Sequence, residues 1–144
     1  MTKNMLVGKT IKAINLDVSG DAIQFLLDDE SIVKAVADGD CCSHTWIEDV
    51  LDPEAAIGSE VLEADDIDLP DHLCEPTKHG HDEDEMEYYG FAIKTAKGVC
   101  TIAYRNSSNG YYGGSLSWPG GYFYGGVFGQ NGVNESWKLI AGSI

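Results

Sequence analysis

The sequence predicts a β-rich α+β domain, mostly antiparallel sheet, with one short helix near residues 43–51 and an acidic loop near residues 70–87. Apolar and polar side chains alternate over short stretches, which is typical of half-buried strands. Turn-forming residues separate these stretches, and carboxylates gather in the middle of the chain. With 43% hydrophobic residues the chain can bury a core, and residues 1–144 are expected to form a single domain.

Three consecutive strands are expected at the start of the chain, over residues 10–18, 22–28 and 32–37. Turns rich in glycine, serine and aspartate separate them, and such short connections join antiparallel neighbours. A meander is therefore expected. Ser43 can cap the short helix that follows, and Pro53 lies just beyond its end.

The acidic middle of the chain predicts little regular structure. Residues 60–69 fit at most an edge strand, because acids interrupt the apolar positions. Residues 70–87 contain two prolines and a run of four carboxylates at positions 82–85. Repulsion between like charges and low hydrophobicity favour a loop here.

Strands are expected again in the last third, over residues 88–96 and 99–105. The pair Asn109-Gly110 then predicts a hairpin, because both positions tolerate positive φ, with a returning strand over residues 111–118. Residues 134–140 fit either a capped helical turn or a final strand.

The charge is large and unevenly distributed. The net charge is −15, and residues 48–87 hold 16 of the 24 acids, whereas residues 88–144 hold 12 of the 17 glycines and 12 of the 14 aromatic residues. Direct binding to nucleic acid is not expected, because it requires positive charge against the phosphates. A basic protein partner suits this charge better.

Two further features concern location. The chain has no apolar run of the roughly 18–20 residues that a membrane helix needs, so no membrane association is expected. Residues 1–8 lack the apolar stretch of a secretory signal, which predicts a cytoplasmic location.

The segment that begins at Arg105 is the candidate binding site. Its side chains offer a planar guanidinium for phosphate or carboxylate, amides and hydroxyls that orient a ligand, and rings that stack on a base or an aromatic partner. A hairpin with a polar loop and no ligand explains the Asn-Gly pair equally well, and both interpretations stay open. The candidate residues are Arg105, Asn106, Ser107, Ser108, Asn109, Tyr111 and Tyr112.

Cys41, Cys42 and His44 are candidates for a zinc site, or for a thiol nucleophile beside a base. A zinc site needs further ligands, and His72 and Cys74 follow at irregular spacing. The favoured interpretation is that the two adjacent cysteines are small buried residues. The sequence carries no P-loop and no arguable Ser-His-Asp arrangement, so no catalytic residue and no cofactor are assigned.

Three segments resemble a family of small phage and prophage proteins that carry a domain of unknown function. They are residues 6–11, residues 39–48 with the motif GDCCSHTW, and residues 105–114 with the motif RNSSNGYYGG. The resemblance covers nearly the whole chain. It implies a viral or mobile-element source, and it implies no established activity.

Three functions fit these observations. The favoured hypothesis is a non-catalytic protein that binds a host protein, acting as an inhibitor in counter-defence, because an acidic face adjoins an aromatic platform. The second is a sponge for a nucleotide-like signal at Arg105, Asn106 and the tyrosines, with a pocket that a homo-oligomer would complete. The third is a zinc-binding protein or a metal-dependent hydrolase.

Overall fold

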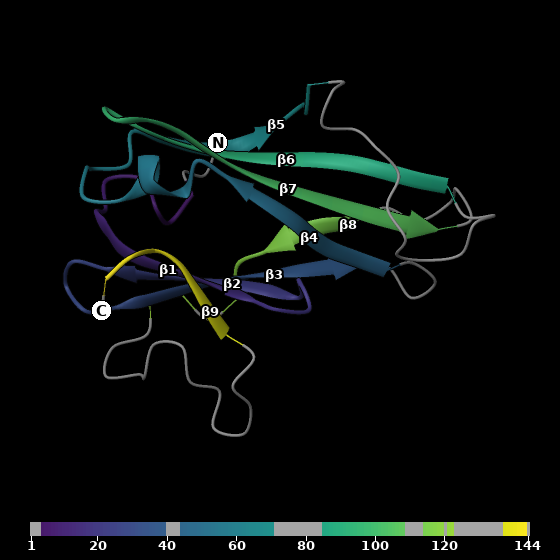
Figure 1. The fold of residues 1–144 in the computed structure, drawn as a ribbon, viewed down its shortest axis with the longest axis horizontal. Helices are drawn as coiled ribbons and strands as arrows, with labels where there is room; N and C mark the ends of the chain where they lie inside the picture. The colour runs from purple at the N-terminus through teal and green to yellow at the C-terminus, as the bar shows by residue number, and fades with distance from the viewer. Residues whose placement is uncertain are drawn as a thin grey trace.

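The computed structural model is built almost entirely of antiparallel β-structure (Figure 1). It describes residues 4–39, 44–70, 85–108, 114–119, 121–122 and 137–143. The elements are β1 (Ile11–Asp17), β2 (Ala22–Leu27), β3 (Ile32–Gly39), β4 (His44–Leu51), the 3-10 turn η1 (Pro53–Ala56), β5 (Glu63–Ile67), β6 (Glu85–Thr95), β7 (Gly98–Ser108), β8 (Gly114–Ser117) and β9 (Trp137–Gly142).

The strands form two sheets, one with the order β8-β3-β2-β1-β9 and one with the order β4-β7-β6-β5. Figure 1 shows them as two layers, with β5, β6 and β7 in one and β1, β2 and β3 in the other. The expected meander of β1, β2 and β3 is confirmed, since β2 pairs antiparallel with both neighbours. No helix in the described part of the chain is long and apolar enough to cross a membrane.

The core lies between the two sheets and draws on both. Phe25 of the five-stranded sheet and Phe91 and Ile102 of the four-stranded sheet belong to one buried apolar cluster. Trp118 connects the layers, because its ring centre lies 6.0 Å from that of Phe25 and 5.1 Å from that of Phe91. Aromatic residues of the last third thus help to close the core, because a large ring buries a large apolar area.

The helix expected near residues 43–51 is wrong, because this segment is the strand β4 and pairs with β7. The physical reason is a register shift between Ile47 and Asp49, which interrupts the two-residue alternation of a strand. Ile47, Val50 and Leu51 then stand at helical spacing although the backbone is extended. In the described residues the only helical element is η1, so the β-rich part of the predicted fold class is confirmed and its α part is not.

The described parts of the acidic segment include strands. β5 lies at the edge of its sheet, as expected for residues 60–69. The loop near residues 70–87 ends earlier than expected, because residues 85–87 belong to β6 and pair with residues 106–108 of β7. Ladder hydrogen bonds hold these acidic residues in a strand despite their composition. Residues 71–84 lie outside the described residues.

The hairpin between β7 and a returning strand is also wrong. β7 is already paired with β4 on one side and with β6 on the other, so it has no free edge. The following strand, β8, pairs with β3 in the other sheet. Asn109 and Gly110 themselves lie outside the described residues. At the end of the chain, the strand alternative holds, because β9 pairs with β1.

Candidate binding site

Arg105 lies in the middle strand β7 and is enclosed. One guanidinium nitrogen is 2.8 Å from a carboxylate oxygen of Glu48, and the Arg105 side chain is only 7% exposed. Trp46 of β4 and Tyr88 of β6 lie opposite Arg105 on its two sides, and its guanidinium carbon is 5.3 Å from the centre of the Tyr88 ring. Arg105 therefore ties three strands together by charge and stacking.

Asn106 and Ser107 are also buried. The hydroxyl of Thr45 donates to the amide oxygen of Asn106 at 2.7 Å, which joins β4 to β7. A ligand at residues 105–107 would need accessible side chains, whereas Arg105, Asn106 and Ser107 are all buried, on an inner strand of their sheet. The side chain of Ser108 and the whole of Asn109, Tyr111 and Tyr112 lie outside the description, so their predicted role stays a prediction.

The metal candidates are only partly placed. His44 is exposed, and its ring stacks on that of Trp46 with 5.2 Å between the ring centres. Cys41, Cys42, His72 and Cys74 fall outside the residues that the structure describes. Within those that it does describe, no group of three or more His, Cys, Asp or Glu side chains is placed to hold a metal ion.

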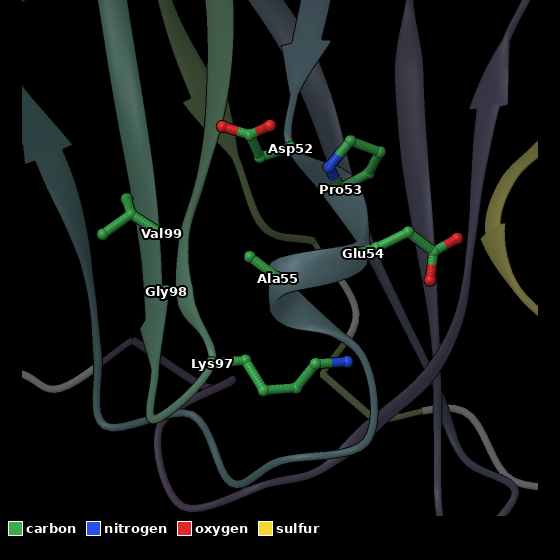
Figure 2. Close-up of a pocket in the computed structure, with 7 residues that line it drawn as sticks. All are labelled: Asp52, Pro53, Glu54, Ala55, Lys97, Gly98 and Val99. Atoms are coloured by element: carbon green, nitrogen blue, oxygen red, sulfur yellow. The ribbon is translucent and has the colours of Figure 1, made fainter.

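Figure 2 shows a hollow of about 570 Å³ beside η1. Its charged groups do not converge, because the carboxylates of Asp52 and Glu54 are directed to opposite sides of the turn (Figure 2). Glu54 accepts a hydrogen bond from the backbone of Gly142 at 3.4 Å, and the ammonium of Lys97 donates to the carbonyl of Ile57 at 2.8 Å. These groups stabilise the packing of η1, and they do not form a site for a common ligand.

A second hollow, of about 560 Å³, brings the acidic segment and the aromatic segment together. Asp66 and Asp68 come from β5 and the residues after it, whereas Tyr89 and Tyr104 come from β6 and β7. The complete lining is Asp66, Ile67, Asp68, Tyr89, Gly90, Tyr104, Gly114 and Ser115. Polar groups beside aromatic and apolar side chains are typical of the lining of binding sites, which makes this hollow the candidate.

Two stacked tyrosines line this hollow, of which Tyr104 is buried in the core and Tyr89 is half-buried. Tyr89 and Tyr104 are directly opposite each other on β6 and β7, and their rings stack with centres 5.0 Å apart and planes at 17°. The hydroxyl of Tyr104 donates to Asp66 at 3.3 Å, and the hydroxyl of Tyr89 donates to Glu87 at 3.0 Å. Each phenol therefore orients a carboxylate.

Both phenols are held in the neutral form. Burial, followed by the negative charge of Asp66 and its hydrogen bond, raises the pKa of Tyr104. Burial also raises the pKa of Tyr89, and Glu87 adds to this effect. At neutral pH the hollow thus combines neutral phenol rings with the carboxylates of Asp66 and Asp68, a set that suits a cation.

Sequence reasoning did not single out Asp66, Tyr89 or Tyr104. The acidic window and the ring-rich half were both recognised as compositional features. What brings them together is the pairing of β5 with β6, which places Asp66 opposite Phe91, next to the tyrosine pair along β6. The adjacent residues Tyr88 and Tyr89 could have indicated the site. Neighbouring side chains of a strand point to opposite faces of the sheet, so each face must carry one of the two rings.

These features define a class: an antiparallel β domain of two sheets, with a carboxylate and tyrosine hollow that residues of both sheets line. Over residues 4–118 the chain matches the family described as Domain of unknown function (DUF7448), and it therefore belongs to that family. The resemblance to a domain of unknown function is thereby confirmed. No curated protein and no solved structure matches the chain.

Proposed function

We propose that this domain is a non-catalytic binding protein whose partner is a positively charged surface of another protein. The observation that carries the proposal is the hollow in which Asp66 and Asp68 meet the stacked rings of Tyr89 and Tyr104. Aromatic rings beside exposed carboxylates are suited to the long cationic side chains of a protein surface.

The surroundings of the hollow support a basic partner. Glu63, Asp65, Asp66 and Asp68 are all exposed along the edge strand β5. Of these, Glu63 forms an ion pair with Lys94 at 3.3 Å, and the side chains of both partners are largely exposed. Together with the net charge of −15, this edge attracts a basic protein at long range and accelerates its association.

The nature of the partner is a further part of the proposal. The resemblance to phage and prophage proteins supports a host protein in the cytoplasm, and inhibition of that protein in counter-defence is the role that we propose. The motifs on which the resemblance rests, at residues 39–48 and 105–114, lie within the region that matches the family.

The two alternatives gain no support from the described residues. A nucleotide-like signal would need the guanidinium of Arg105 for its phosphate, but Glu48 already provides that guanidinium with an anion. The zinc interpretation depends mainly on Cys41 and Cys42, which are outside the described part of the chain. Neither is therefore put forward as a second function.

The test is capture of partners from a host-cell lysate by the tagged protein, with the double variant Asp66→Asn/Asp68→Asn. We expect the wild type to enrich a basic protein at moderate salt and the variant to lose most of it, because two carboxylates of the contact are gone. The control is Asp21→Asn/Asp28→Asn, which removes the same charge from exposed turns of the other sheet. Equal loss in both variants, or no partner at moderate salt, would contradict the proposal.

A further inference from the structure

We infer that the hollow formed by β5, β6, β7 and β8 receives the guanidinium of an arginine side chain that the partner protein provides. This inference rests on the proposed function, and it names the chemical group at the centre of the contact. It follows from three properties of the hollow, namely the half-buried ring of Tyr89, the carboxylate that Tyr104 orients, and the acidic character of the described lining.

The half-buried ring of Tyr89 favours a planar cation. Tyr104 is buried, and its ring stacks on that of Tyr89 at 17°, so Tyr104 supports one face of Tyr89 and leaves Tyr89 as the accessible ring. A guanidinium is flat and weakly hydrated, so it stacks on an aromatic face more favourably than a compact, strongly hydrated ammonium does. The Tyr89 ring therefore favours arginine over lysine.

The carboxylates are placed for a donor with several N–H groups. Asp66 is exposed and accepts the hydroxyl proton of Tyr104, so one oxygen is fixed by the buried phenol. Asp68 lines the same hollow two residues further on. A guanidinium carries five N–H donors in a fixed plane and can reach two acceptors at once.

The described lining of this hollow is acidic, in contrast to that of three other hollows among the described residues. Lys97 lines the hollow at η1, Lys138 lines one beside Trp46, and Lys94 lines one near Leu62. The described lining of the Tyr89–Tyr104 hollow contains two aspartates and no lysine or arginine. A cation from outside is the group that this lining lacks.

The experiment titrates the purified full chain with N-acetyl-arginine amide, N-acetyl-lysine amide and the neutral isostere N-acetyl-citrulline amide. The ring signals of Tyr89 and Tyr104 in proton–carbon NMR spectra report the site, assigned with Tyr89→Phe and Tyr104→Phe. We expect the arginine probe to shift both signals saturably, with at least about fivefold higher affinity than the lysine probe and no saturable shift from citrulline.

The variants separate a specific site from a diffuse acidic surface. Asp66→Asn/Asp68→Asn should weaken binding of the arginine probe at least about tenfold, whereas Asp21→Asn/Asp28→Asn should leave it unchanged. Circular dichroism of each variant checks that the fold is kept, and Asp66→Asn alone, which retains a hydrogen-bond acceptor for Tyr104, serves if the double variant unfolds.

Equal binding of the arginine and lysine probes, or an absence of saturable shifts at the two tyrosines, would overturn the inference. That result leaves a successful capture of a basic partner intact, because other side chains could then make the contact. Conversely, arginine binding at the tyrosines with no partner captured would contradict the proposed function and support the cation site.

Discussion

Glu48 illustrates how the buried charge of Arg105 is held in this fold. Its carboxylate is 2.8 Å from the guanidinium of Arg105 and accepts a hydrogen bond from the indole of Trp46 at 3.3 Å. The side chain of Glu48 is 27% exposed, against 7% for Arg105. Removing the charge of Glu48 would leave the guanidinium in a place where water compensates poorly.

We therefore predict that Glu48→Gln lowers the free energy of unfolding by about 1–3 kcal/mol. The matched control is Glu30→Gln, which removes an ion pair of similar length, 2.7 Å to Lys12, between side chains that are 40% and 68% exposed. Glu30→Gln should lower the free energy of unfolding by less than about 0.5 kcal/mol. Urea denaturation of the two variants measures both values, and equal losses would show that burial of the Arg105 pair has no energetic consequence.

The same residues show what sequence can predict at this scale. The sequence indicates that the guanidinium of Arg105 can bind a phosphate or a carboxylate. Its anion is the chain's own Glu48, on a strand whose extended form the sequence did not predict. Residue type thus indicates what a side chain can bind, whereas the burial of that side chain depends on strand order, which no local pattern encodes.

At its first residue, β8 lies in close contact with the opposite sheet. A Cβ atom on Gly114 would lie 2.3 Å from the hydroxyl oxygen of Thr45, 2.9 Å from its methyl group and 3.1 Å from the Cβ of Asn106. The first strand residue of β8 must therefore be glycine, so that its backbone can approach β4 and β7.

We predict that Gly114→Ala destabilises the domain by about 1–3 kcal/mol, because the added methyl group overpacks this contact. Thr45→Ala removes the atoms that clash, so the double variant should be less destabilised than the sum of the single variants by at least about 1 kcal/mol. Thermal unfolding of the four proteins measures this coupling. Strict additivity would mean that β8 does not lie against Thr45.

The elements differ in how far local sequence determines them. β1, β2 and β3 were predicted because short turns join neighbouring strands and alternation is regular. β4 was missed because the register shift after Ile47 breaks that alternation. The sequence predicted that the strand after Asn109-Gly110 pairs with β7, whereas β8 belongs to the other sheet. An Asn-Gly pair has the same local turn propensity in both cases, so it does not indicate which strands pair.

At the scale of the whole molecule, the dominant physical property is its negative charge. The net charge of −15 is carried largely by exposed side chains, as on β5, where only Glu63 is placed in an ion pair among the described contacts. Repulsion among these carboxylates opposes the compact state more than it opposes the expanded one. The sequence predicted this property fully, because total charge does not depend on the fold.

We accordingly predict that sodium chloride stabilises the domain while it weakens partner binding. Between about 10 mM and about 300 mM salt the Debye length falls from about 30 Å to below 8 Å, so repulsion between distant carboxylates is screened. The melting temperature should rise by roughly 2–6 °C, equivalent to about 1–2 kcal/mol in a domain of this size. Potassium chloride should act equally, since screening depends on ionic strength and not on the cation.

The variant Asp66→Asn/Asp68→Asn tests whether repulsion is the cause. It lowers the negative charge on the β5 edge, so it should melt at a higher temperature than the wild type at low salt and gain less from added salt. The buried pair of Arg105 and Glu48 should change little with salt, because screening is weak in the interior. A melting temperature that falls with salt, in the wild type, would mean that surface ion pairs such as Glu63 with Lys94 outweigh the repulsion.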